Sequence, residues 1–204
     1  MVRSLLILII SFNVFSKDNL NEEVFKQLVE LIESDSATQS FIISNDNEVV
    51  HEYYGDGYTR NDLATSWSIS KTFYAALFGV AIEKGLISYS DLQKPISFFI
   101  PELIEDSKSQ LTLYNLLAMR SGLEITEYLN EEMFFSIDNL NFAMNAQPAM
   151  PQGEIYEYNN VNTMLLNPII KSIFKEEPHN VLIKEIFDPL GIDRYGLWSD
   201  SAGN

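Results

Sequence analysis

Residues 65–82 read TSWSISKTFYAALFGVAI, and no charged residue lies between Lys71 and Glu83. The run after Lys71 is apolar on every side of a helix, which predicts a helix that is buried all round. Ser68 and Lys71 form an S-x-x-K pair, and side chains three residues apart on a helix lie about 5–6 Å from each other. A serine hydroxyl is a weak nucleophile until a base takes its proton, and a lysine made neutral by burial can serve as that base.

The S-x-x-K spacing is weak by itself, because about one such pair is expected by chance in a chain of this composition. The chain contains two, Ser68/Lys71 and Ser172/Lys175. Lys175 stands beside Glu176 and Glu177, which indicates a solvated helix end. Lys71 precedes an apolar helix, where a lysine carries a desolvation cost. The alternative for Ser68/Lys71 is a plain helix N-terminus whose lysine reaches out to solvent.

Two Tyr-x-Asn pairs occur as well, again close to the number expected by chance. Tyr128/Asn130 lies in an acidic segment, residues 127–132, that we predict to be a solvated loop. Tyr158/Asn160 follows a Pro/Gly turn and precedes a helix, where side chains can point into a cleft. A tyrosinate at Tyr158 could act as a base or proton shuttle. The alternative is a core tyrosine followed by a capping asparagine.

The remaining sequence predicts a mixed order of elements. Apolar spacing predicts a helix over residues 20–33, capped by Asn19 or Asn21, and alternation around a turn predicts a β-hairpin over residues 41–54. Residues 91–102 are expected to form a loop with short helical pieces. Three further helices are predicted over residues 112–121 (with Thr112 as cap and Gly122 as stop), 161–175 and 181–187.

Charge and composition exclude several classes of function. The 204 residues include 29 acidic and 13 basic ones, for a formal net charge of −16. Nucleic acid is therefore excluded as a partner, since such binding relies on Lys and Arg at phosphates. The chain has no Cys and two His, which removes thiol catalysis and Cys-ligated metals and leaves little for a His-rich metal site. We predict no cofactor.

The N-terminus has the three-part order of a secretory signal peptide. Arg3 supplies positive charge, residues 5–15 are largely apolar, and Ser16 ends the run. The apolar run is shorter than the roughly 20 residues needed to span a bilayer. We predict a signal peptide over residues 1–16, export to the periplasm or the exterior, and no membrane span after cleavage. The alternative is a buried N-terminal strand or helix.

Seven segments occur in the order seen in the beta-lactamase-related serine hydrolases, and the chain resembles this family over about residues 38–200. The segments are Tyr58, residues 66–71 (SWSISK), 83–87 (EKGLI), 99–102 (FIPE), 111–123 (LTLYNLLAMRSGL), 153–160 (GEIYEYNN) and 188–192 (DPLGI). The family includes class C beta-lactamases, D-Ala-D-Ala peptidases, esterases and nylon-oligomer hydrolases, and the last branch is the most similar. The resemblance implies an α+β fold, with an antiparallel sheet flanked by helices and a helical subdomain, over residues 17–204.

The resemblance also implies roles for four residues. Ser68 is expected to be the acylated nucleophile, Lys71 its activating base or hydrogen-bond partner, and Tyr158 a second base or acid. Asn160 is expected to line the cleft. The implied activity is hydrolysis of a small-molecule amide or ester through an acyl-enzyme.

The chain departs from the family pattern in its C-terminal part. Members carry a Lys-Thr-Gly or His-x-Gly strand that forms one cleft wall, and no such triplet occurs here. The later sheet strands are missing too, and Pro168 stands inside a helix where the family usually has Gly. We therefore interpret the chain as the N-terminal portion of a serine hydrolase. The alternative is an inactive remnant, or one half of a split enzyme that needs a complementary C-terminal chain. In either case we expect these 204 residues to be inactive, or nearly so, alone.

Overall fold

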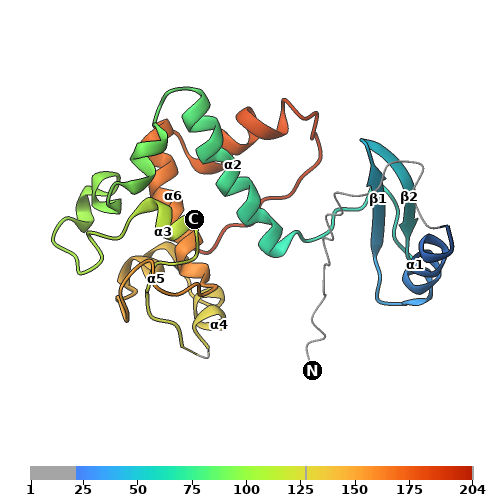
Figure 1. Cartoon of the computed structure of the whole chain (residues 1–204), viewed down its shortest axis with the longest axis horizontal. Coiled ribbons are helices and arrows are strands. Elements are labelled where there is room, and N and C mark those ends of the chain that lie inside the picture. Colours follow the sequence, from blue (N-terminus) through green and yellow to red (C-terminus); the bar gives the residue numbers. More distant parts are fainter. Residues whose placement is uncertain (1–21, 127, 204) are drawn as a thin grey trace. The chain divides into compact units, whose positions relative to one another are not determined.

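The computed structural model describes residues 22–126 and 128–203. The predicted signal peptide, residues 1–16, lies outside them. The chain divides into two compact units, Met1–Ala64 and Thr65–Asn204, which are described separately (Figure 1). The prediction of one hydrolase domain over residues 17–204 stays a prediction.

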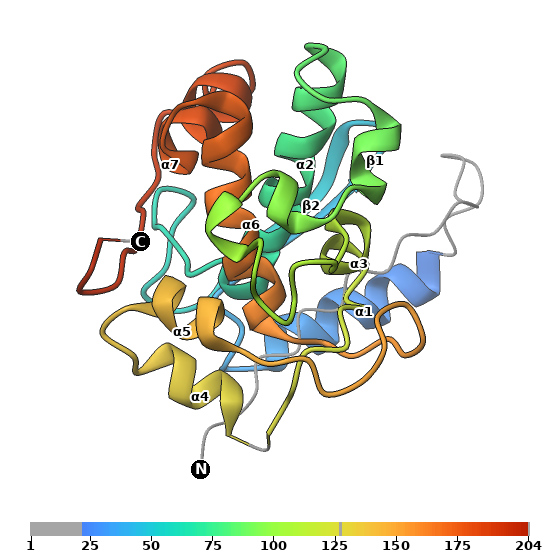
Figure 2. The same ribbon diagram turned by 90° about the vertical axis from the view of Figure 1, so that its left-hand side faces the viewer.

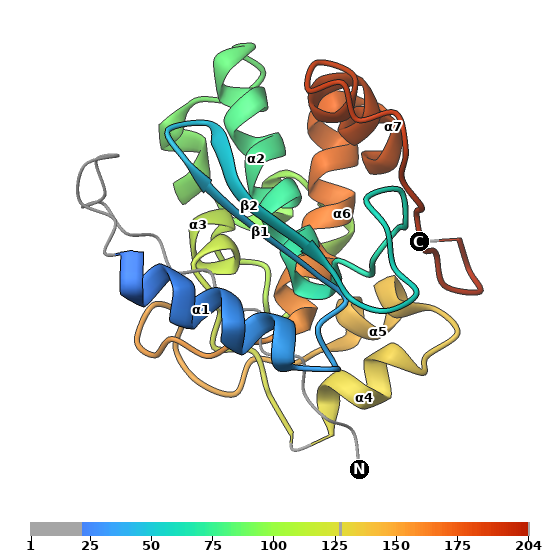
Figure 3. The ribbon, with the colours of Figure 1, turned by 90° about the vertical axis from the view of Figure 1, so that its right-hand side faces the viewer.

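The first unit contains a β-hairpin and one helix. Strands β1 (Ser40–Asn45) and β2 (Glu48–Tyr54) pair antiparallel, which confirms the predicted hairpin. Asp46 and Asn47 make the turn with φ angles of 48° and 65°, the left-handed values that a two-residue hairpin turn needs. Helix α1 (Glu22–Ser34) confirms the predicted helix within the described residues, and its predicted caps fall outside them. Helix α1 lies beside the hairpin (Figure 3). Phe25 of α1 and His51 of β2 form an edge-to-face ring contact.

The second unit is organised around α6 (Asn160–Phe174), with six of its fifteen residues buried (Figure 2). Five other helices contact it: α2 (Ser70–Glu83), α3 (Leu113–Leu117), α4 (Leu129–Phe134), α5 (Asn139–Asn145) and α7 (Pro178–Leu182). Pro168 lies within α6, so the helix that the sequence predicts over residues 161–175 forms despite a residue that removes one backbone donor. None of the described helices is long and apolar enough to cross a bilayer.

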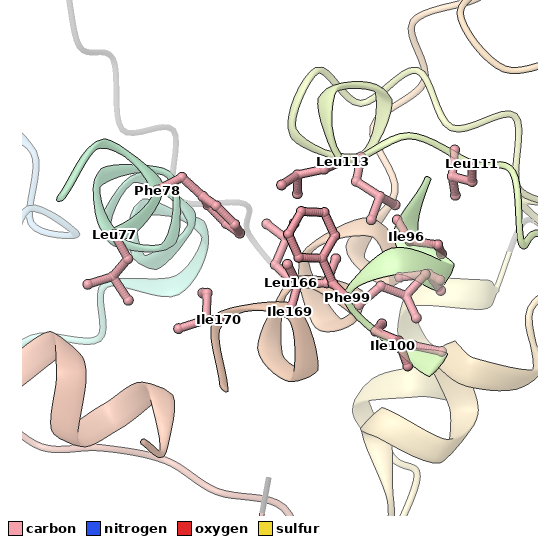
Figure 4. Close-up of a cluster of buried hydrophobic side chains, with 14 of the residues drawn as sticks. Leu77, Phe78, Ile96, Phe99, Ile100, Leu111, Leu113, Leu166, Ile169 and Ile170 are labelled. Atoms are coloured by element: carbon pink, nitrogen blue, oxygen red, sulfur yellow. The ribbon is translucent and has the colours of Figure 1, made fainter. Parts of the chain in front are cut away.

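Buried apolar side chains from α2, α3, α6 and the segment between α2 and α3 form the core of this unit (Figure 4). The residues labelled there are Leu77, Phe78, Ile96, Phe99, Ile100, Leu111, Leu113, Leu166, Ile169 and Ile170. Removal of these side chains from water is the main favourable contribution to folding. The core therefore ties α2, which follows Ser68, to α6, which follows Tyr158.

Short helical segments connect the longer helices. Three 3-10 turns, η2 (Tyr89–Gln93), η3 (Ile96–Phe98) and η4 (Pro101–Leu103), confirm the predicted loop with helical pieces. The helix predicted over residues 181–187 is shared between α7 and a π-helical turn, η5 (Ile183–Phe187). The described part thus combines helices with one antiparallel pair of strands, as the α+β prediction requires.

The prediction that α2 is buried on all sides is wrong. Leu77, Phe78 and Ala81 are buried, but the opposite face of the helix, which includes Ala75 and Gly79, is exposed. The exposed positions carry small side chains, which leave little apolar area in water. Hydropathy counts Ala and Gly as apolar, and so it cannot separate this face from the core-facing one.

Two other predictions also need correction. The acidic segment predicted as a solvated loop is helical from Leu129, because Leu129 and Met133, four residues apart, are both buried. The helix predicted over residues 112–121 begins as expected, with Thr112 accepting from the Asn115 amide at 3.2 Å, but ends at Leu117. It is Met119, with φ of 54°, rather than Gly122 that follows the helix end in a left-handed conformation.

Candidate active site

Ser68 lies in a 3-10 turn, η1 (Trp67–Ile69), which runs directly into α2. The sequence places it in the first helical turn, and the structure places it just ahead of α2. Trp67 has φ of 44°, a left-handed value that is uncommon for a large residue. The Ser70 hydroxyl donates to the Trp67 carbonyl at 2.7 Å, which fixes the backbone on either side of Ser68.

The structure brings together three of the four predicted site residues. The Lys71 ammonium donates to Ser68 Oγ at 3.1 Å, and the Tyr158 hydroxyl donates to the same oxygen at 2.6 Å. Lys71 Nζ also lies 5.1 Å from the centre of the Tyr158 ring, within range of a cation–π contact. A nucleophile within hydrogen-bond reach of two groups able to handle its proton is the arrangement that activated serines require.

Hydrogen bonds of the residues on both sides of Tyr158 hold it in place. The Glu157 amide donates to the Met119 carbonyl at 2.9 Å. Asn159 is 2% exposed and caps α6, accepting from the Val161 amide at 2.9 Å. The Asn159 side-chain amide also donates to the Glu124 carbonyl at 3.2 Å. Tyr158 therefore projects from a segment whose two neighbours are fixed, while its own side chain is 41% exposed.

Hydrogen bonds join the segment before Tyr158 to the residues that follow α3. The Gly153 amide donates to the Arg120 carbonyl at 2.8 Å, and Arg120 Nη2 donates to the Glu154 carbonyl at 3.3 Å. Sequence reasoning assigned no role to Met119, Arg120 or Asn159. Asn159 could have been found as a helix cap, because it precedes the apolar pattern of α6. The pairing of residues 119–120 with residues 153–157 joins segments far apart in the sequence, and no local sequence pattern predicts it.

The surroundings of Tyr158 make its hydroxyl easier to ionise than that of a free tyrosine. Burial of Tyr158 acts to raise its pKa, while hydrogen bonds with Lys71 and Ser68 and the charge of Lys71 act to lower it. The lowering effects prevail, so the pKa of Tyr158 falls below its ordinary value of 10.0. A phenol with a lowered pKa is better matched to accept a proton near neutral pH.

The fourth predicted residue, Asn160, begins α6 two residues after Tyr158 and is half-buried. Its predicted role in lining the cleft stays a prediction. Of the competing motifs, Tyr128 precedes α4 and is 60% exposed, and Lys175 ends α6 with φ of 60° in an exposed position. Within residues 22–126 and 128–203, no group of three His, Asp or Glu side chains could hold a metal ion.

With this geometry in place, comparison with known families is decisive. A family model described as Beta-lactamase matches residues 22–204. The chain belongs to the beta-lactamase family. The match covers Ser68, Lys71 and Tyr158 in one stretch, and so the resemblance seen in the sequence motifs is confirmed.

Relatives of this beta-lactamase-family chain agree with the fold. A 6-aminohexanoate-dimer hydrolase from Paenarthrobacter ureafaciens is 26% identical over 93 residues, which cover 46% of this chain and 23% of that protein. A putative beta-lactamase from Bacteroides dorei DSM 17855 has a TM-score of 0.69 at 17% identity, covering 85% of this chain and 52% of that one. An octameric penicillin-binding protein homologue from Pyrococcus abyssi has a TM-score of 0.66 at 21% identity. The match covers 88% of this chain and 45% of that one.

These likenesses confirm the beta-lactamase/transpeptidase-like α+β fold that the sequence predicts. They also fix the extent of the match, because this chain spans about half the length of the solved structures.

Proposed function

We propose that this chain provides the nucleophilic centre of an exported serine hydrolase that cleaves an amide or ester bond through an acyl-enzyme on Ser68. One observation carries the proposal: Ser68 Oγ accepts hydrogen bonds from both Lys71 and Tyr158. An exposed serine with two such partners is poised for attack on a bound carbonyl. Family membership supports the same conclusion.

The geometry supports a proton path through Tyr158. In its ionised form Tyr158 accepts the Ser68 proton while Ser68 Oγ bonds to the carbonyl carbon of the substrate. The positive charge of Lys71 stabilises the tyrosinate before the transfer. Tyr158 then returns the proton to the leaving nitrogen or oxygen as its bond to carbon breaks, which leaves the acyl group on Ser68. A water molecule then bonds to the acyl carbon and gives its proton to Tyr158. Tyr158 passes this proton to Ser68 Oγ as the bond between Ser68 and the acyl carbon breaks, which releases the acid and restores the starting state.

The proposed substrate is a small molecule with an amide or ester bond. The relatives named above include a 6-aminohexanoate-dimer hydrolase and a putative beta-lactamase, and both names point to amide chemistry in those proteins. The net charge of −16 argues against nucleic acid as a partner. Export rests on the signal-peptide pattern in residues 1–16.

A second candidate is that these 204 residues act only together with a complementary segment or chain. The observation that favours it is the sheet of the first unit, which among the described residues has two strands. A two-stranded hairpin is marginal on its own, and its edges are open to pairing.

Labelling with a fluorophosphonate, followed by mass measurement, tests both candidates. One adduct on Ser68 of the 204-residue chain, absent from Ser68→Ala, would support the first candidate and contradict the expected inactivity of these residues alone. Ser172→Ala, from the other S-x-x-K pair, is the matched control and should label like the unaltered chain. A chain with a native circular dichroism spectrum and no adduct would agree with the expected inactivity and favour the second candidate.

A further inference from the structure

An aromatic cluster includes Trp67, the residue that directly precedes Ser68. We define it by three side chains, Trp67, Phe134 and Trp198. The ring of Trp67 lies 6.0 Å from that of Phe134 in a tilted arrangement and 5.8 Å from that of Trp198 in an edge-to-face arrangement. The three come from η1, α4 and the segment after η5, so the fold gathers them from distant parts of the sequence.

Burial in a core does not explain the cluster. The exposed fractions of the three side chains are 57%, 55% and 70%, and none of the three belongs to the buried core. Exposed apolar groups gathered in one place usually mark a binding surface. Trp67 also holds a left-handed backbone, and such strain persists where it serves a function. This residue is joined directly to Ser68.

Three acidic residues stand close to members of the cluster in the sequence, while the nearby cation, Lys71, bonds to Ser68 Oγ. Glu131 and Glu132 stand in the first turn of α4, ahead of Phe134. Asp200 follows Trp198 by two residues, and its carboxylate accepts from the Asn139 amide at 2.7 Å. An anionic group on a ligand would meet repulsion here, whereas the faces of indole rings attract neutral rings and cations.

From these observations we infer that Trp67, Phe134 and Trp198 form a subsite for an uncharged or cationic aromatic group of the substrate, next to the bond that Ser68 attacks. The inference rests on the proposed function, because it names the substrate class of the same site. It assigns these three residues to specificity and leaves proton transfer to Tyr158 and Lys71. Offset and edge-to-face packing on the rings would hold the substrate ring.

Tryptophan fluorescence can measure ligand binding at the cluster. The chain has two, and both belong to the cluster, so all tryptophan fluorescence reports on this subsite. The experiment uses the chain with Ser68→Ala, which cannot be acylated, and titrates it with 4-phenylbutanamide. Two matched probes are butanamide, which lacks the ring, and 4-phenylbutanoate, which carries a negative charge.

We expect 4-phenylbutanamide to shift tryptophan emission saturably, and at least tenfold lower affinity for each matched probe. Adding Trp198→Ala should weaken binding about three- to tenfold, the range expected for loss of one aromatic pair, and Trp198→Phe should restore most of it. Tyr89→Ala removes an equally exposed ring from η2 and should change nothing. Circular dichroism confirms that each variant is folded.

Equal binding of butanamide, or unchanged binding in a folded Trp198→Ala variant, would overturn the inference. An emission shift that depends on protein concentration without ligand would also overturn it, since a second copy of the chain would then cover the cluster. Because Ser68→Ala removes the chemistry, these outcomes leave the fluorophosphonate test of the proposed function independent.

Discussion

Tyr158 is the residue whose chemistry depends most on its neighbours. Its pKa is lowered because Lys71 and Ser68 act together against the effect of burial. If the tyrosinate is the base, labelling of Ser68 should rise with pH as Tyr158 loses its proton, with a midpoint below the ordinary tyrosine pKa of 10.0. A lysine base would give the same trend, so the pH profile alone does not assign the base, and substitution must.

Replacing Tyr158 with Phe removes the hydroxyl that lies 2.6 Å from Ser68 Oγ and keeps the ring. We expect the rate of Ser68 labelling to fall by about 10²–10⁴, the usual contribution of a general base. The rising limb of the pH profile should disappear as well. Tyr128→Phe, in the other Tyr-x-Asn pair, is the control and should behave as the unaltered protein. A Tyr158→Phe variant with the original rate and profile would remove Tyr158 from the mechanism.

Replacing Lys71 with Met tests the role of its charge. The substitution removes the ammonium group that hydrogen-bonds Ser68 and lies over the Tyr158 ring. Without it the pKa of Tyr158 should rise, so the alkaline limb of the labelling profile should move to higher pH and the rate at neutral pH should fall. Lys175→Met is the matched control at an exposed helix end. A profile with an unmoved midpoint would show that Lys71 does not tune Tyr158.

Among the structural elements, the contact between residues 119–122 and 149–157 is the one on which the position of Tyr158 depends. Gly122 lies at its closest point, with φ of 71° and its carbonyl accepting from the amides of Ala149 and Met150. A Cβ atom at Gly122 would stand 2.2 Å from the Met150 carbonyl oxygen, which no backbone tolerates without moving. Gly is therefore required here by both space and conformation.

Gly122→Ala should consequently destabilise the chain strongly, by several kcal/mol in the free energy of unfolding, because strain and a backbone clash add together. The matched control is Gly79→Ala in α2, where a Cβ would meet nothing within 4 Å. That substitution should stabilise the chain by about 0.5–1 kcal/mol through helix propensity. Urea unfolding followed by circular dichroism measures both. Similar stabilities for the two variants would contradict the clash.

The elements that sequence predicts well are those that local chemistry specifies. The hairpin turn at Asp46–Asn47 and the Thr112 cap could both be predicted from the sequence, because each depends on residues within a few positions. The exposed face of α2 could not be predicted, because hydropathy scales count Ala and Gly as apolar whether they are exposed or buried. Helix α4 was missed because two buried residues, Leu129 and Met133, sit among acidic ones. In the site, sequence motifs predicted Ser68, Lys71 and Tyr158. The hydrogen bonds that hold Tyr158 in place, from Asn159 and from residues 119–120, could be identified only in the folded structure.

For the chain as a whole, the division into two units shows what the site depends on. Ser68, Lys71 and Tyr158 all belong to the unit Thr65–Asn204, as do the supports of Tyr158 and the aromatic cluster. The geometry of the trio therefore comes from the helical core around α6. The hairpin unit Met1–Ala64 contributes none of the contacts described for the trio.

Export is the remaining proposal, and it rests on residues 1–16. Their order of positive charge, apolar run and small residue is what the secretion machinery reads, and the apolar run is too short to stay in a bilayer. Protein recovered from a secreting host should therefore begin near Lys17 by N-terminal sequencing. Leu8→Arg breaks the apolar run and should block export, whereas Leu28→Arg, at an exposed position of α1, should not. A mature product in the cytoplasm that keeps Met1 would contradict export.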